Sequence, residues 1–309
     1  MASHVWHLEN CRFRVTVQAQ GGELCSLWDK GMDREWLWQP QEGVWNNSAT
    51  QLFPVIGRLI HGGIWQGEQF CPLPAHGFLR EQVFCCVEQS ASRLTLEATA
   101  SNATFAVWPW RWRVTLSFEL TDDGLLFSQK VNNDDTTPFW YSVGWHPGFA
   151  LPLSSEQGWQ VRFAGDGVKG PMPTCQRTLT VAENLQKKDV FLLQADSFTD
   201  GAVYFADCQE QLIQVCTPDG KTVLSMETTV QEWLALWGVP GADLLCIEPL
   251  AGTTDAPDFD GQAGNKRGMR QLAPGESQVL SVRLRFPVDV RSTGSQNTGQ
   301  CCYPGAEAS

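Results

Sequence analysis

The feature of this sequence that most constrains its fold is a strict alternation of polar and apolar residues in short runs. Residues 113–120 read Arg-Val-Thr-Leu-Ser-Phe-Glu-Leu, so that every second side chain is apolar. Successive side chains of a β-strand point to opposite faces of a sheet, so this pattern predicts a strand with one buried face. No long segment carries the 3.6-residue apolar period of an amphipathic helix. We therefore expect an all-β protein.

Turn residues between such runs predict β-hairpins. Residues 122–124 (Asp-Asp-Gly) separate two of the runs, and residues 218–220 (Pro-Asp-Gly) separate two others. Many short strands with Gly, Pro and Asp turns are typical of an antiparallel sandwich or barrel. Short helical turns are expected around residues 183–187. The predicted strands are 13–17, 94–98, 113–120, 125–131, 161–163, 203–205, 211–215, 222–224, 233–237, 244–247 and 281–286.

Composition favours one large domain. Hydrophobic residues make up 42% and charged residues 18% of the 309 positions, which is sufficient for a substantial core. No repeat and no linker-like stretch divides the chain, so residues 1–290 are expected to form a single domain. Residues 291–309 are rich in Ser, Thr, Gly and Gln, and we expect them to form a flexible polar tail.

Charge and cysteine usage narrow the functional classes. The net charge of −12 disfavours nucleic acid and anionic membrane surfaces as partners. The 11 cysteines include no C-x-x-C pair, and the first residues carry no signal-peptide pattern, so a cytoplasmic protein with reduced thiols is expected. The five histidines show no metal-ligand spacing, so neither a metal nor another cofactor is expected. A small molecule is the expected partner, with monomer and homodimer both left open.

Two motif-like segments are interpreted as loops. Residues 165–170 match the letters G-x-G-x-x-G, but Pro171 and Pro173 forbid the helix that a dinucleotide site requires. Asp255, Asp258 and Asp260 faintly resemble a calcium loop, and their spacing fails the pattern. We therefore expect a turn in the first segment and a solvated loop in the second.

Four other segments contain candidate functional residues. Arg58 stands in an apolar run and is either a surface arginine or a buried fork for hydroxyl groups and carboxylates. His76 precedes a glycine on a constrained loop, four residues before Arg80. His146 and Glu248 each precede a proline, which favours an extended backbone at both positions. For each of these residues a purely structural role is the alternative, and for Glu248 that role is an ion pair with Arg58 or Arg80.

Taken together, these residues are typical of acid/base chemistry on a hydroxylated substrate. Two histidines, one carboxylate and one arginine can move protons without a covalent nucleophile or a metal. A glycoside hydrolase would need a second carboxylate as an equal partner. A carbohydrate-binding sandwich would share the strands and the 14 tryptophans but would not need both His146 and Glu248. Both alternatives stay open at this point.

The ordered motifs FPVIGRL (53–59), HGFLR (76–80), GWHPGF (144–149) and CIEPLAG (246–252) resemble the aldose 1-epimerase (galactose mutarotase) family. The resemblance is greatest to its LacX-like branch and extends over roughly residues 5–288. It implies an antiparallel β-supersandwich. It also implies an enzyme that interconverts the α and β anomers of an aldose without a cofactor. Trp145 and Leu250 depart from the branch pattern, so the resemblance leaves the preferred sugar open, including one carrying a phosphate or sulfonate group.

The resemblance also implies a role for each candidate. His146 falls on the general acid that protonates the ring oxygen, and Glu248 on the general base at the C1 hydroxyl. His76 and Arg58 are expected to orient the sugar, and Arg80 to join them. An aspartate on a later strand is implied as well, and Asp200 is the candidate. Trp237 is expected to offer a stacking plane.

The protonation states follow from opposing effects. Burial of His146 would lower its pKa, and a neighbouring carboxylate would raise it. We expect the carboxylate to prevail, with Glu248 ionised and His146 protonated near neutral pH.

Overall fold

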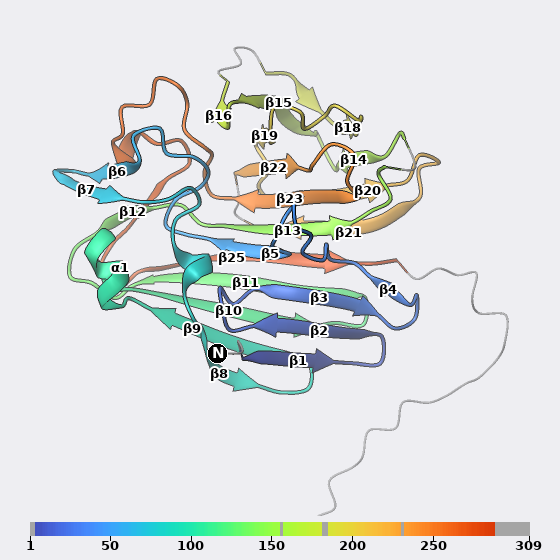
Figure 1. The fold of residues 1–309 in the computed structure, drawn as a ribbon, viewed down its shortest axis with the longest axis horizontal. Coiled ribbons are helices and arrows are strands. Elements are labelled where there is room, and N and C mark those ends of the chain that lie inside the picture. The colour runs from blue at the N-terminus through green and yellow to red at the C-terminus, as the bar shows by residue number, and fades with distance from the viewer. Residues whose placement is uncertain (1–3, 155–156, 181–184, 230–231, 288–309) are drawn as a thin grey trace, which may run out of the picture.

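The computed structural model describes residues 4–154, 157–180, 185–229 and 232–287, and its strands form five antiparallel sheets (Figure 1). The described residues contain one short helix, α1 (Asn102–Val107), and two 3₁₀ turns, η1 (Leu79–Glu81) and η2 (Ala263–Asn265). The predicted all-β class is therefore confirmed.

The largest sheet has nine strands. Its centre is formed by the predicted hairpin, in which Leu120 pairs with Leu125 and Trp112 with Asn133. In order across the sheet the strands are β18 (Val190–Leu192), β14 (Gln160–Phe163), β20 (Leu212–Cys216), β21 (Thr222–Thr228), β25 (Ser277–Arg285), β11 (Gly124–Asn133), β10 (Trp112–Leu120), β9 (Arg93–Thr99) and β8 (Cys85–Gln89).

The second large sheet has eight strands. In order its strands are β16 (Thr178–Leu179), β15 (Val168–Cys175), β19 (Val203–Ala206), β22 (Trp233–Trp237), β23 (Leu244–Leu250), β13 (Gly144–Ala150) and β5 (Ala49–Leu52), with β17 (Lys187–Lys188) paired to β15 off this path.

Three smaller sheets complete the fold. One has the order β1 (Val5–Glu9), β2 (Phe13–Gln18), β3 (Leu24–Asp29) and β4 (Arg34–Glu35). The other two pair β6 (Gly63–Gln66) with β7 (Gln69–Pro72) and β12 (Phe139–Tyr141) with β24 (Arg270–Leu272).

The core fills the space between the two large sheets. The rings of Phe127 in β11 and Trp145 in β13 stack with centroids 4.4 Å apart, and those of Phe163 in β14 and Phe205 in β19 are 5.1 Å apart. Because Trp145 points into this core, the alternation of a strand turns its neighbour His146 to the opposite face of the eight-stranded sheet. The candidate histidine is thus directed away from the nine-stranded sheet.

Some local features differ from the sequence-based expectation. Helix α1 was not predicted; it begins at a capping box, in which the side chains of Ser101 and Thr104 each bond to the other's backbone N–H. At the expected helical turn, residues 181–184 lie outside the described residues, and Lys187 belongs to strand β17. The predicted tail, residues 291–309, also lies outside them. No helix in the described part of the chain is long and apolar enough to cross a membrane.

Candidate functional site

The site is organised by one row of side chains that crosses the eight-stranded sheet. On β13 and β23, Gly144 pairs with Leu250 and Gly148 with Cys246, so the register between these pairs sets His146 opposite Glu248. Directly opposite residues share one face of a sheet and lie close enough to interact. The sheet register therefore brings together two residues that are about a hundred positions apart in the sequence.

The row continues on both sides of this pair. Thr50 of β5 pairs with His146, and Ala235 of β22 pairs with Glu248. Tyr204 of β19 in turn pairs with Ala235. Thr50, His146, Glu248 and Tyr204 all line a cavity of about 450 Å³, called the central cavity below. That volume lies within the roughly 300–1,000 Å³ typical of small-molecule sites.

His146 and Glu248 form the polar centre of this row. The His146 Nε2 and Glu248 Oε1 atoms are 3.4 Å apart, and the side chains are 11% and 4% exposed. Glu248 is therefore paired with His146, and not with Arg58 or Arg80 as the purely structural interpretation expected. The pair is therefore close enough for a proton to pass between its members, directly or through a bound hydroxyl group.

Two tryptophans enclose the histidine ring. Trp45 stacks on His146 with centroids 4.9 Å apart and planes at 25°, and Trp237 meets it edge-on at 5.8 Å. A Cβ on Gly148 would lie 2.6 Å from the Trp45 ring, so only glycine leaves room for the stack at that position. Trp237 lies in the central cavity, as predicted. Trp45 was missed because its sequence neighbourhood carries no motif.

Burial dominates the electrostatics of the pair. Desolvation is the main cause that lowers the pKa of His146 from 6.5 to about 3, and the charge of the nearby Arg80 acts in the same direction. Desolvation likewise raises the pKa of Glu248 well above its ordinary value. Both directions oppose the expectation that the carboxylate would keep His146 protonated. Burial favours a neutral imidazole beside a protonated carboxyl group.

His76 is held against the same cavity by a strained loop. Its φ is +67°, a conformation that residues with side chains rarely adopt, and such strain is concentrated at functional sites. The backbone N–H of Gly57 donates to His76 Nδ1 at 3.4 Å, and the His76 N–H donates back to the Gly57 carbonyl at 3.1 Å. Its ring centroid is 5.8 Å from that of His146. Burial is the main cause that lowers the pKa of His76 well below its ordinary value, so the ring is neutral. Because Nδ1 accepts the Gly57 N–H, the proton of this neutral ring lies on Nε2.

Three arginines also line the central cavity: the predicted Arg58 and Arg80, and Arg177, which was not predicted. Arg58 and Arg177 are exposed at the residue level, whereas Arg80 is half-buried. The two alternatives for Arg58 thus resolve to a surface arginine whose side chain borders the cavity. Arg177 lies in the turn between β15 and β16, where no sequence motif pointed to it.

Asp200 does not occupy the position expected of it. It is exposed, and among the described residues that line the central cavity the neighbouring Gly201 and Ala202 appear instead. Its backbone carbonyl accepts a hydrogen bond from the Thr174 hydroxyl at 3.3 Å. Glu248 is the one residue with a carboxyl group among those lining residues.

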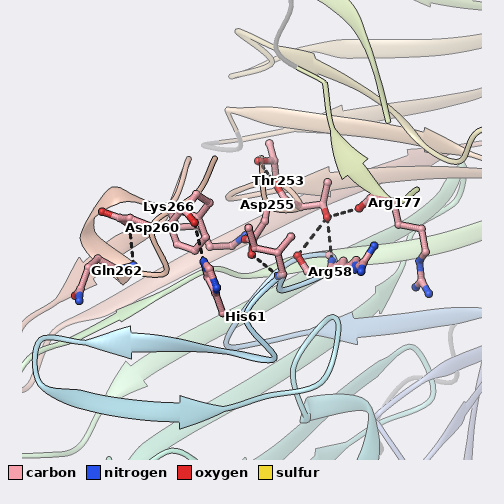
Figure 2. Close-up of polar contacts among 12 residues, drawn as sticks. Arg58, His61, Arg177, Thr253, Asp255, Asp260, Gln262 and Lys266 are labelled. Atoms are coloured by element: carbon pink, nitrogen blue, oxygen red, sulfur yellow. Dashed lines mark hydrogen bonds and ion pairs between the residues drawn. The ribbon is translucent and has the colours of Figure 1, made fainter. Parts of the chain in front are cut away.

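Asp255 has a structural partner in place of the solvated loop that was expected. It forms a fully buried ion pair with Lys266 (Figure 2). Asp258 and Asp260 of the same loop are exposed. Within the described ranges, no group of three or more His, Cys, Asp or Glu residues lies close enough to hold a metal ion.

Comparison with known proteins agrees with this geometry. Residues 4–285 match the sequence profile described as Aldose 1-epimerase. The chain belongs to the aldose 1-epimerase family. The family's members bind aldose sugars.

Two curated relatives match part of this family member. Protein LacX of Lactococcus lactis subsp. lactis is 27% identical over 154 residues, which are 47% of this chain and 50% of LacX. Protein YphB of Escherichia coli K12 is 26% identical over 175 residues, 52% of this chain and 56% of YphB. The match thus spans about half the length of these relatives.

Solved structures of aldose 1-epimerase-like proteins share the whole fold. The galactose mutarotase related enzyme of Lactobacillus acidophilus superimposes with a TM-score of 0.84 at 23% identity, covering 92% of this chain and 98% of that one. A galactose mutarotase-like protein of Lactobacillus casei gives 0.83 at 23% identity, with 92% and 100% covered. The predicted galactose mutarotase-like fold is therefore confirmed.

Proposed function

We propose that this protein is an aldose 1-epimerase that interconverts the α and β anomers of a hexose or related aldose. The observation that carries the proposal is the pairing of His146 with Glu248 at 3.4 Å in a cavity of about 450 Å³. Mutarotation needs one proton donor and one proton acceptor on the same sugar, and this pair supplies both. The free thiols of the nine described cysteines are consistent with action in a reducing compartment such as the cytoplasm.

The reaction needs only proton transfers. A base removes the proton of the C1 hydroxyl, the C1–O5 bond breaks as C1 becomes an aldehyde, and an acid protonates O5. Rotation about C1–C2 presents the other face of the aldehyde, and the same transfers run backward to close the ring. Glu248 is the proposed base and His146 the proposed acid. Each such transfer contributes on the order of 10²–10⁴ to a rate.

The pair reaches the required protonation by moving one proton within itself. Burial favours the acid form of Glu248 and neutral His146. Transfer of that proton to His146 creates a carboxylate and an imidazolium with no change in net charge. The surrounding residues have positioning roles: His76 and the arginines face the sugar hydroxyls, and Trp45 and Trp237 flank the imidazole.

The decisive assay follows optical rotation after a pure α anomer is dissolved with the protein, across a panel of aldoses. Glu248→Gln keeps the shape of the side chain and removes the base, so the rate should fall by about 10²-fold or more while sugar binding persists. Glu88→Gln, on the exposed strand β8, is the matched control and should retain the full rate. His146→Asn should lose most of the rate, whereas His76→Asn should mainly raise KM.

The same assay separates the other two classes. A carbohydrate-binding protein would bind sugars saturably without speeding their interconversion. A glycoside hydrolase would act on glycosides and release reducing sugar, although the described cavity lining supplies one carboxyl group where that chemistry uses two. A Glu248→Gln variant with the wild-type rate would overturn the assignment.

A further inference from the structure

The lining of the central cavity carries an excess of positive charge. Arg58, Arg80 and Arg177 border it, and Glu248 is the one carboxyl-bearing residue among the lining residues that the structure describes. The whole protein has 34 acidic and 22 basic residues, a net charge of −12. The charge of the cavity lining is therefore opposite in sign to the net charge of the protein, which points to a role for these arginines at the cavity.

Two of these arginines have no carboxylate partner within the described residues. Some other arginines do have such a partner, as Arg12 has in Asp29 at 2.7 Å and Arg113 has in Asp134 at 2.8 Å. Arg58 donates through Nη1 to the Gln176 carbonyl at 2.8 Å, which leaves its other donors available. The field of Arg177 reaches into the cavity, because its charge is among the causes that lower the pKa of His76.

The backbones that carry Arg58 and Arg177 are tied together by one hydroxyl group. Thr254 Oγ1 accepts the Arg58 backbone N–H at 3.0 Å and donates to the Arg177 carbonyl at 2.7 Å. A Cβ on Gly57 would lie 2.4 Å from the Thr254 Cβ, so only glycine permits this approach. Both guanidinium groups extend on the right-hand side of the network in Figure 2.

A buried ion pair holds Thr254 in place. The next residue, Asp255, donates its N–H to the Arg58 carbonyl at 3.2 Å and accepts the Ile60 N–H at 2.9 Å. Its carboxylate pairs with Lys266, and both side chains are at most 1% exposed (Figure 2). The two arginines are thus mounted on a rigid support, called the Thr254–Lys266 clamp below.

The turn that presents Arg177 is held in a strained backbone. Cys175 pairs with Thr178, so Gln176 and Arg177 form a two-residue hairpin turn, with φ of +50° and +65°. Such turns strongly favour Asn-Gly or Gly-Gly, and other residues cost about 1–2 kcal/mol each in this conformation. An arginine is therefore kept where a glycine would be more stable, and strain of this kind is concentrated at ligand-binding sites.

We propose that Arg58 and Arg177 form a subsite for an anionic substituent, so that the preferred substrate is an aldose carrying a phosphate, sulfonate or carboxylate group. The inference rests on the proposed function and names its substrate class. The planar guanidinium fork matches the oxygens of all three groups. Two such forks also offset the repulsion between an anionic sugar and a protein of net charge −12.

The test compares kcat/KM for anomer interconversion of glucose with that of its 6-phosphate, 6-sulfonate and 6-carboxylate derivatives. At least one anionic sugar should exceed glucose by about tenfold or more, and the rank of the three identifies the anion. Arg177→Gln should lower the ratio of anionic to neutral kcat/KM by about 10–100-fold, as expected for a hydrogen bond to a charged group. Arg14→Gln makes the same charge change at an exposed position of strand β2 and should leave the ratio unchanged.

Binding measurements separate this inference from the proposed activity. In Glu248→Gln protein, calorimetry of the best anionic sugar measures the subsite without turnover, and adding Arg177→Gln should weaken Kd about tenfold or more. Arg58→Gln should act in the same direction. If glucose is interconverted while anionic sugars gain nothing and Arg177→Gln changes neither ratio nor Kd, the subsite is wrong and the activity stands. If anionic sugars bind through Arg177 but no aldose is interconverted, the activity is wrong and the subsite stands.

Discussion

Burial shifts the pKa values of the paired side chains of His146 and Glu248 in opposite directions. Burial lowers the pKa of His146 to about 3 and raises that of Glu248 well above its ordinary value. Below the His146 pKa the pair gains a second proton and loses its base. Above the Glu248 pKa the pair loses its last proton and has no acid to offer.

The pH dependence of kcat/KM should therefore be bell-shaped, with the two limbs assigned to these groups. The acid limb should lie well below pH 6.5 and reflect protonation of His146, and the alkaline limb should reflect loss of the Glu248 proton. Glutamine does not titrate, so the residual rate of Glu248→Gln should lack the alkaline limb. An alkaline limb that survives in this variant would assign it to another group.

The sequence predicted most of the cavity-lining residues that belong to recognisable motifs and missed cavity-lining residues that have no motif around them. Proline after His146 and after Glu248 marked both, and the cavity lining contains them together with His76 and Trp237. Arg177 and Thr254 come from the connections between strands, and Tyr204 comes from the predicted strand at 203–205, whose neighbours are set only in the folded chain. Their side chains carry no local pattern, so only tertiary structure can show that they meet.

Among the structural elements, the loop after β23 contains a buried ion pair that we expect to stabilise it. Lys266 and Asp255 are at most 1% exposed, and desolvation lowers the pKa of Lys266. Removing one member of a buried pair leaves the other charge without compensation, which costs about 3–5 kcal/mol. Lys266→Met should therefore lower the free energy of unfolding in urea by about that amount.

A surface pair provides the control for this prediction. Lys169 and Asp207 are 2.9 Å apart but 47% and 50% exposed, and exposed pairs contribute about 0–1 kcal/mol. Lys169→Met should therefore change the free energy of unfolding by no more than about 1 kcal/mol. Equal losses in the two lysine variants would show that the Thr254–Lys266 clamp does not stabilise the loop through its charges.

The strands were easier to predict than the segments that join them. Alternation along residues 113–120 reflects one buried and one half-buried face, which is the burial pattern of β10. Helix α1 has only six residues, too few to show a helical period, and only its capping box marks it. The Asp255 loop was interpreted as solvated because its charged residues resemble a surface segment, whereas Lys266 makes its burial possible.

For the whole molecule, the described fold is complete before the predicted tail begins. The last strand, β25, ends at Arg285 and pairs with both β11 and β21 in the nine-stranded sheet. We propose that residues 1–290 are the single domain expected from sequence. Deleting residues 292–309 should then leave the melting temperature and the anomer-interconversion rate nearly unchanged, measured by calorimetry and polarimetry. A substantial loss of either would show that the tail contributes to the fold or to an oligomer interface.

The sandwich class was predictable because turn residues and alternation recur along most of the chain, and the order of the four motifs identified the family. The pairing of distant strands was not predictable in this way. β13 lies between β5 and β23, about a hundred residues away on either side. Sequence patterns define each strand but carry no information about which strand will be its neighbour.

The cross-strand row at His146 and Glu248 has a consequence for how such proteins diversify. The proposed acid/base pair is fixed by the ladder of β13 and β23, whereas Arg58, His76 and Arg177 come from the connections around it. Substitutions or length changes in those connections alter which sugar is held without displacing the pair. The acid/base pair on the strands can therefore be kept during evolution while the sugar-contacting residues in the turns change. Related proteins can in this way share one sheet and act on different sugars.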